Sequence, residues 1–208
     1  MNVIIDIAGA LLSIISGYFY IKEKPVAWLI SLAAIPFDVA MDISIGVYGD
    51  LFLQFLYFVL LIYGWYTWRN GAKVEDGLPM LRMTAKQFYF WGLVALTAVY
   101  LIWLSLNRYT DSEVALLDAT VTCLSIVAQW LLCRKMIESW LLWIFVDCLY
   151  VILFVYKQMP FHGAMALFDA GVCVMGYLYW VREYRVSQPA AEPAMPQVDF
   201  DETVTQAE

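Results

Sequence analysis

Seven apolar stretches of similar length most limit what this 208-residue chain can form. Each is close to the roughly 20 residues that an α-helix needs to cross the hydrocarbon core of a bilayer. The chain is 63% hydrophobic and only 15% charged, which is too much apolar mass for one soluble core. The sequence therefore predicts an all-α membrane protein with seven transmembrane helices, at residues 3–21, 26–45, 51–68, 88–106, 114–133, 139–156 and 164–181.

The basic residues are divided unequally between the two ends of these helices. One side holds Arg108 and Lys157. The other side holds the remaining ten: Lys22, Lys24, Arg69, Lys73, Arg82, Lys86, Arg134, Lys135, Arg182 and Arg185. Cytoplasmic loops of membrane proteins carry the excess of Lys and Arg. We therefore expect the N-terminus outside and the C-terminus in the cytoplasm, an arrangement that requires an odd number of spans.

The two ends of the chain match each other when one is shifted by 112 residues. The matched pairs are Asp6 with Asp118, Ser13 with Ser125, Lys22 with Arg134, Trp28 with Trp140, Gly64 with Gly176 and Trp68 with Trp180. The offset relates residues 3–68 to residues 114–181 and leaves the helix at 88–106 as a linker. Both triplets begin on the same side, so we predict parallel repeats in a 3+1+3 order. This architecture favours a binding site near the midplane, between the triplets.

The end of the chain differs in composition from the rest. We expect the transmembrane domain to span residues 1–182. Residues 183–208 contain three prolines, six acidic residues and almost no large apolar run. Such a segment cannot bury enough apolar surface to fold, so it is predicted to be a disordered acidic tail in the cytosol.

Several classes of protein are disfavoured by the residue types present. The four cysteines lie in apolar runs and show neither disulfide nor metal-ligand spacing. The single histidine, His162, falls in an outer loop, so no Ser-His-Asp set can be proposed. A net charge of −7 argues against a nucleic-acid partner. We therefore expect no enzyme, no metal and no cofactor.

Acidic residues inside the predicted spans indicate a functional site. There are six, and no Lys, Arg or His accompanies them: Asp6, Asp38, Asp42, Asp118, Asp147 and Asp169. A charge at the bilayer centre costs a few kcal/mol, so such residues normally face a cavity or a partner. Asp6 and Asp118 lie near outer helix ends, where we expect them to brace the helix N-terminus. Asp147 lies close to the midplane, which makes it the strongest candidate for contact with a ligand.

Polar and aromatic stripes accompany these acids. Trp140, Trp143 and Asp147 are spaced i, i+3 and i+7, so they share one helix face. Aromatic faces and a carboxylate together suit a cationic ring. Two further polar stripes point into the bundle: Gln54 and Tyr57 in the third helix, and Thr122, Ser125 and Gln129 in the fifth. Asp38 and Asp169 complete the candidate site. We assign the other prominent tryptophans to the membrane interfaces: Trp65, Trp68, Trp103, Trp130 and Trp180.

The segments that carry these stripes resemble a known family. QFLYFVLLIYGWYTW at 54–68, LSIVAQWLLCRK at 124–135, ESWLLWIFVDCLYV at 138–151 and GYLYW at 176–180 are similar to the PnuC transporters of nicotinamide riboside. The resemblance covers nearly the whole chain to about residue 185. It implies a bacterial inner-membrane protein with a SWEET-like fold, which works by facilitated diffusion, assembles as an oligomer such as a trimer, and relies on a cytosolic kinase to trap its substrate.

The resemblance also implies roles for individual residues. Gln54, Tyr57, Trp140 and Trp143 correspond to binding positions, whereas Asp147 stands where nicotinamide riboside carriers often have Asn. The leading hypothesis is uptake of nicotinamide riboside by alternating access, with Asp147 offsetting the charge of the pyridinium ring. Thiamine, another cationic vitamin carried by relatives, stays an alternative, and so does a proton-coupled carrier. Besides the substrate, the expected partners are membrane lipids and further copies of the chain.

Overall fold

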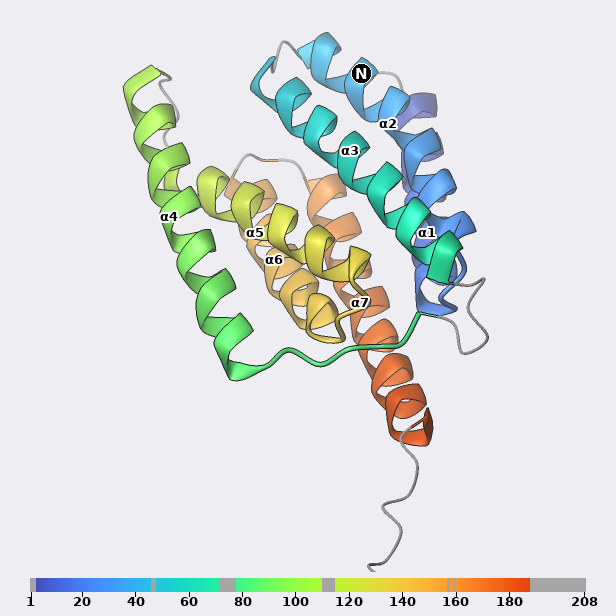
Figure 1. Cartoon of the computed structure of the whole chain (residues 1–208). Helices are drawn as coiled ribbons and strands as arrows, with labels where there is room; N and C mark the ends of the chain where they lie inside the picture. Colours follow the sequence, from blue (N-terminus) through green and yellow to red (C-terminus); the bar gives the residue numbers. More distant parts are fainter. Residues whose placement is uncertain are drawn as a thin grey trace, which may run out of the picture.

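The computed structural model describes residues 3–45, 48–71, 78–109, 115–156, 158 and 160–187. This part of the chain is helical, as predicted, and Figure 1 shows its helices as a bundle. The described helices are α1 (Val3–Ile21), α2 (Val26–Ile45), α3 (Tyr48–Gly71), α4 (Ala85–Tyr109), α5 (Ala115–Cys133), α6 (Glu138–Tyr156) and α7 (Pro160–Ser187).

Three helices are longer than the apolar stretches from which they were predicted. α3 and α4 extend by about one turn at each end, and α7 begins at Pro160 and ends at Ser187. Proline is well tolerated in the first helical turn, and the Arg and Glu residues after residue 181 are good helix formers. The prediction of a tail from residue 183 is therefore wrong for 183–187, and residues 188–208 lie outside the described part.

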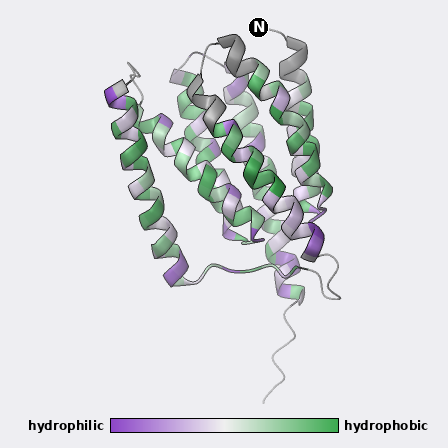
Figure 2. Ribbon diagram, turned by 45° about the horizontal axis from the view of Figure 1, so that its top comes forward, coloured by the Kyte–Doolittle hydropathy of each residue, from purple (hydrophilic) through white to green (hydrophobic). Residues whose placement is uncertain are grey.

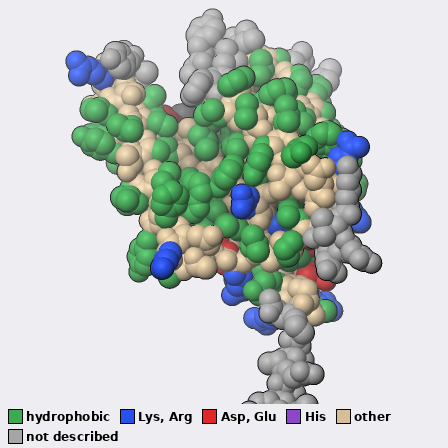
Figure 3. All heavy atoms as spheres, in the orientation of Figure 1, with side chains coloured by type: hydrophobic (Ala, Val, Ile, Leu, Met, Phe, Trp, Pro, Cys, Tyr) green, Lys and Arg blue, Asp and Glu red, His purple; other side chains and the backbone are tan. Residues whose placement is uncertain are grey.

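The surfaces of these helices are those of a membrane protein. Among the described helices, α4, α5, α6 and α7 are long and apolar enough to cross a membrane, while α1 and α2 contain shorter apolar stretches at Leu11–Ile21 and Val26–Phe37. Figure 2 shows hydrophobic residues along most of the helix lengths. In Figure 3, hydrophobic side chains cover most of the visible middle of the molecule. Only 6% of the apolar window of α4 is buried, which leaves nearly its whole circumference available to lipid.

The described helices pack as two groups of three with α4 at the edge. α2 packs against α1 and α3, and α6 packs against α5 and α7. The groups meet where α3 contacts α5 and where α1 contacts α7. Within the described part, α4 contacts α5 alone, and Figure 1 shows it standing beside the bundle. The space between the two groups is where a central cavity can form.

The turns that end α1 and α5 have the same backbone geometry. Glu23 and Lys135, which are 112 residues apart, adopt the left-handed conformation with φ of 54° and 51°. In each turn the next amide donates to the carbonyl five residues before it, at 2.9 Å after Glu23 and 3.0 Å after Lys135. This is the hydrogen bond of a Schellman motif, which ends a helix by satisfying its last carbonyls. Each three-helix group thus begins with the same helix–turn–helix unit.

Four buried tryptophans form an aromatic layer beside these turns. They are Trp28, Trp68, Trp140 and Trp180, each no more than 3% exposed. Ring centroids lie 5.3 Å apart for Trp28 and Trp68, 6.0 Å for Trp68 and Trp180, and 5.3 Å for Trp140 and Trp180. The prediction that Trp68 and Trp180 lie at a membrane interface is wrong, because both pack inside the protein.

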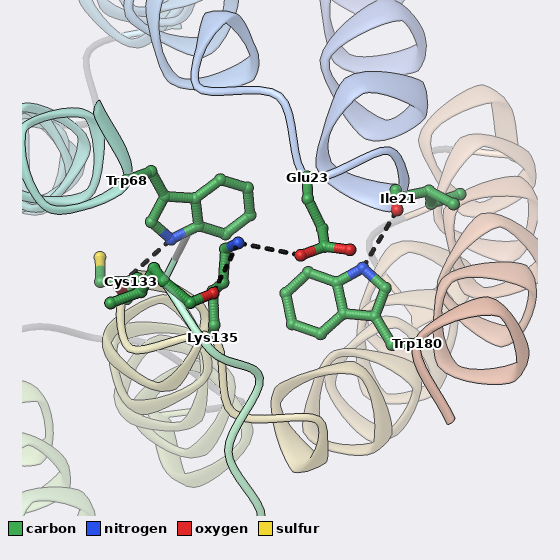
Figure 4. Close-up of polar contacts among 7 residues, drawn as sticks. Ile21, Glu23, Trp68, Cys133, Lys135 and Trp180 are labelled. Atoms are coloured by element: carbon green, nitrogen blue, oxygen red, sulfur yellow. Dashed lines mark hydrogen bonds and ion pairs between the residues drawn. The ribbon is translucent and has the colours of Figure 1, made fainter. Parts of the chain in front are cut away.

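Two indole hydrogen bonds in the aromatic layer cross between the groups in opposite directions (Figure 4). The Nε1 of Trp68 in α3 donates to the carbonyl of Cys133 in α5 at 3.2 Å. The Nε1 of Trp180 in α7 donates to the carbonyl of Ile21 in α1 at 3.1 Å. The two donors, Trp68 and Trp180, are 112 positions apart, and so are the two acceptors, Ile21 and Cys133. The two hydrogen bonds therefore correspond to each other. They tie each group to the helix end of the other.

Glycine permits the close approach of the other two tryptophans. A Cβ at Gly176 would lie 2.6 Å from the ring of Trp140, and a Cβ at Gly64 would collide with the ring of Trp28. Gly64 and Gly176 are again 112 positions apart. Each indole therefore lies close against a helix backbone that has no side chain at that point.

Candidate functional site

A cavity of about 260 Å³ opens among helices of both groups. Most of its wall comes from α1, α2 and α3, and α5 and α6 each add one residue. This volume lies at the small end of ligand pockets, which range from about 300 to 1,000 Å³. The lining residues are Ser13, Ser16, Tyr20, Ser31, Ala34, Ile35, Gln54, Tyr57, Leu61, Gln129 and Trp143.

The lining is polar without being charged. Three serines, two tyrosines and two glutamines face the cavity, together with one indole and three small or aliphatic residues. The hydroxyls of Tyr20 and Ser31 lie 3.0 Å apart and share a hydrogen bond. The Ser16 hydroxyl donates to the carbonyl of Ser13 at 2.9 Å. Hydroxyls and amides can both donate and accept, so this wall can bind a ligand that carries hydroxyl or carboxamide groups.

Four of the residues predicted for the site lie in this wall. They are Gln54 and Tyr57 from α3, Gln129 from α5 and Trp143 from α6. Ser125 lies beside the wall: it is fully buried, donates to the carbonyl of Val121 at 2.8 Å and interacts with the Tyr57 hydroxyl. Helices of both groups therefore bring these five side chains together, although they come from distant parts of the sequence.

The predicted acids lie elsewhere. Asp147 is 93% buried on α6, one helical turn beyond Trp143, and its Oδ2 lies 3.6 Å from the Sγ of Cys173 on α7. The half-buried Asp169 of α7 is close enough to interact with Asp147 electrostatically. These residues form a carboxylate pair between α6 and α7, outside the lining of the cavity. The side chain of Asp38 falls outside the described residues.

Trp140 is separated from the cavity although it shares a stripe with Trp143. Its ring belongs to the aromatic layer, where it packs against Gly176 and, edge to face, against Trp180. The stripe from Trp140 to Asp147 rises about 10 Å along the helix at 1.5 Å per residue. One end of the stripe therefore lies in the aromatic layer, its middle at the cavity and its far end at the carboxylate pair.

The sequence pattern of a protein family described as "Nicotinamide mononucleotide transporter" matches residues 3–182. This chain belongs to that family. The family is one of membrane transporters, so the chain is a transporter and not an enzyme. The resemblance to PnuC proteins that the sequence motifs suggested is confirmed.

Individual proteins similar to this chain are transporters by name. The nicotinamide riboside transporter PnuC of Escherichia coli is 24% identical over 167 residues, which cover 68% of this chain and 70% of that protein. The riboflavin/roseoflavin transporter RibM of Streptomyces davaonensis is 29% identical over 155 residues, 70% of each chain. The crystal structure of the vitamin B3 transporter PnuC has the same fold, with a TM-score of 0.74, 22% identity and coverage of 89% of this chain and 83% of that one.

Sequence reasoning missed one wall of the cavity in this transporter. Ser13, Ser16 and Tyr20 on α1 are spaced i, i+3 and i+7, and therefore share one face of the helix. The same spacing identified the stripe on α6. The missed stripe carries no charge. Serine hydroxyls can bond to carbonyls of their own helix, as Ser16 does, and a tyrosine is common in apolar helices, so the stripe gave a weak signal of function.

Proposed function

We propose that this chain carries nicotinamide riboside across the bacterial inner membrane. The proposal is supported by membership of the transporter family, by the substrate in the name of the E. coli relative and by the chemistry of the cavity. The observation that carries it is an uncharged, hydroxyl- and amide-rich cavity with one indole in its wall. A pyridine ring, a carboxamide and a ribose each find a matching group in such a wall.

The uncharged wall also favours the riboside over its phosphorylated form. None of the eleven lining residues is Lys, Arg or His. Binding of a phosphate normally uses cationic side chains or helix N-termini, and burying an unpaired dianion is costly. We therefore propose that nicotinamide mononucleotide is excluded, even though the family description carries that name. A cytosolic kinase that phosphorylates the riboside would then prevent its return and drive net uptake by facilitated diffusion.

Each residue that the sequence predicted for the site receives a role in this proposal. The ring of the substrate stacks on Trp143, while Gln54, Gln129, Tyr57 and the neighbouring Ser125 bind its carboxamide and hydroxyls. Asp147, one helical turn from Trp143, offsets the positive charge of the ring together with Asp169, with which it interacts electrostatically. A unit charge about 8 Å distant still contributes about 2 kcal/mol at an effective dielectric constant of about 20. Trp140 supports Trp143 from the aromatic layer, and Asp38 stays a further candidate on α2.

We infer the architecture of the transport cycle from the recurrence of contacts at an offset of 112 residues. The two groups of three are parallel repeats joined by α4 as a linker, in a 3+1+3 order like that of SWEET proteins. All seven helices span the membrane, with the N-terminus outside and the C-terminus in the cytoplasm. The groups rock about the cavity to alternate access. Assembly into trimers, with lipid on the outer faces, completes this proposal.

A riboflavin carrier is the second candidate, because RibM is 29% identical over 70% of each chain. Against it, a cavity of about 260 Å³ leaves little room for a three-ring flavin. Thiamine carries a positive charge, as nicotinamide riboside does, so charge alone does not distinguish these two substrates. A proton-coupled mechanism would use the carboxylate pair, and uptake that resists a proton ionophore would count against it.

The test is ligand binding to the purified full chain by isothermal titration calorimetry. We expect nicotinamide riboside to bind with a Kd below 1 mM and nicotinamide mononucleotide, thiamine and riboflavin to bind at least tenfold more weakly. Failure of nicotinamide riboside to bind below the millimolar range would remove the proposal. Tighter binding of thiamine or riboflavin would change the proposed substrate and leave the proposed site unchanged.

A matched pair of variants tests the position of the site. Tyr57→Phe removes one hydroxyl from the cavity, whereas Tyr89→Phe removes one from a side chain that is 74% exposed on α4. A lost hydrogen bond of about 1 kcal/mol corresponds to binding about fivefold weaker. We expect that loss for Tyr57→Phe alone, and equal affinities for the two variants would place the ligand elsewhere.

A further inference from the structure

Lys135 joins four parts of the chain at one end of the bundle. Its Nζ lies 2.9 Å from Oε2 of Glu23, in the turn after α1, and 3.1 Å from the carbonyl of Leu78, in the segment before α4. The same ammonium lies 5.1 Å from the ring centroid of Trp68. Figure 4 shows this ion pair, in which the Lys135 side chain is 9% exposed and that of Glu23 is 26% exposed.

The segment before α4 passes over this ion pair and is bonded to the turn after α5. The amide of Leu81 donates to the carbonyl of Lys135, and the amide of Ile137 donates to the carbonyl of Leu81, both at 3.0 Å. The amide of Met83 donates to Oε2 of Glu138 at 2.9 Å. This strap therefore belongs to the α5–α7 group at the end where Glu23 of the other group meets it.

The aromatic layer lies between the ion pair and the cavity. Tyr20 lines the cavity, and its ring packs edge to face on Trp28 at 4.9 Å and on Trp68 at 6.0 Å. Trp68 in turn lies beneath the ammonium of Lys135. From the cavity outwards the order is therefore Tyr20, the buried indoles and the ion pair.

The contacts at this end hold the two groups together. The Glu23–Lys135 pair and the two indole hydrogen bonds all join α1–α3 to the α5–α7 group. Within each group, by contrast, one tryptophan packs on a glycine of the same group: Trp28 on Gly64 and Trp140 on Gly176. Rocking the groups apart at this end would break the contacts between them and leave those inside each group intact.

We propose that the Glu23–Lys135 ion pair and the aromatic layer form the closed gate of the cavity at this end of the bundle. This inference rests on the proposed transport function, in which the same end faces the cytoplasm and releases the substrate. Separation of the pair moves Tyr20 and Trp68 of the α1–α3 group away from Trp180 of the α5–α7 group and opens the cavity on that side. The pair thereby sets how often the gate opens, without contact with the substrate.

The experiment measures access to the cavity without any substrate. Ser31→Cys places a thiol in the cavity wall with a change of one atom, and a membrane-impermeant maleimide is added to right-side-out or inside-out vesicles. The full chain without Ser31→Cys corrects for the native cysteines. The labelling rate is then compared among Glu23→Lys, Lys135→Glu and the double exchange of both residues. Arg134→Glu is the matched control, because it changes the charge equally at the adjacent exposed position.

We expect each single reversal to speed labelling at least tenfold from the inside-out side only. The double exchange should return the rate to within threefold of the starting protein, because it restores an ion pair but not the bond to Leu78. Arg134→Glu should leave the rate unchanged. Single reversals that speed labelling less than threefold, or a double exchange as fast as the single reversals, would overturn the gate.

Two milder variants keep the test decisive if a reversal prevents folding. Glu23→Gln and Lys135→Met preserve side-chain size and remove one charge each, and both should speed labelling at least threefold. Unchanged labelling in both would also overturn the gate. Because the assay contains no ligand, a failure of nicotinamide riboside to bind would leave its result intact. If nicotinamide riboside is taken up normally and these variants do not change the labelling rate, the proposed gate is wrong and the proposed transport function stands.

Discussion

The two three-helix groups match closely at the gate end and differ at the level of the cavity. In the aromatic layer, positions 112 apart carry the same residue, as Trp28 and Trp140 do. In the cavity wall, the counterparts of Ile35, Tyr57 and Leu61 are Asp147, Asp169 and Cys173. Packing of identical units favours identical residues. A ligand that has one charged end and one neutral end is better served by an uncharged cavity wall with carboxylates beyond it in the α5–α7 group.

The largest expected effect tests whether the two halves of the aromatic layer are equivalent. Gly64→Val and Gly176→Val would each drive a side chain into an indole, and overpacking of this kind costs about 3 kcal/mol. Both should lower the apparent Tm in detergent by about 6–12 °C, measured as loss of monodisperse protein after heating. Gly171→Val is the control, because a Cβ there has no neighbour within 4 Å. Equal shifts in all three variants would contradict the close approach.

The next effect tests the carboxylates that, among the described side chains, only one of the two groups carries near the cavity. Asp147→Asn removes one carboxylate and keeps the size of the side chain. Loss of about 2 kcal/mol of attraction corresponds to about 30-fold weaker binding of nicotinamide riboside. The reduced riboside has a neutral ring of nearly the same shape, and its affinity should stay within twofold. Equal losses for both ligands, measured by calorimetry, would mean that Asp147 acts through the shape of the protein.

The smallest expected effect distinguishes tryptophans whose indole N–H donates a hydrogen bond from those whose N–H has no partner among the described residues. Trp68→Phe removes the hydrogen bond to Cys133, whereas the buried Nε1 of Trp28 has no partner among the described residues. Both substitutions lose similar ring volume and keep an aromatic ring, so the difference between them includes one hydrogen bond of about 1 kcal/mol. We expect Trp68→Phe to melt about 2–4 °C below Trp28→Phe. Identical melting would show that the bond between the groups contributes nothing to stability.

The helices and the pairing of positions 112 apart could be predicted because both depend on patterns along the chain. Hydropathy marks a helix wherever it lies, and Trp, Gly and Ser are informative because they recur at one spacing. The surroundings of individual tryptophans could not be predicted in this way. An indole near a helix end suits both a membrane interface and a buried layer, and only the packing of Trp68 and Trp180 against other helices distinguishes the two.

The candidate site was predictable in part for a related reason. Spacing assigned Trp143 and Gln54 to inward faces, and the structure has both in the cavity wall. Spacing does not say how far along its axis a helix meets a neighbour. One stripe therefore included Trp140, Trp143 and Asp147, which lie at three different levels.

Glu23 and Lys135 occupy the same turn in the two halves and meet each other across the join. A dimer of two separate, identical chains would place the same side chain at both positions. Two glutamates or two lysines there would repel each other. Here both turns lie on one chain, so one position can hold a glutamate and the other a lysine. The single chain thus has an attractive contact at positions where two identical chains would place like charges.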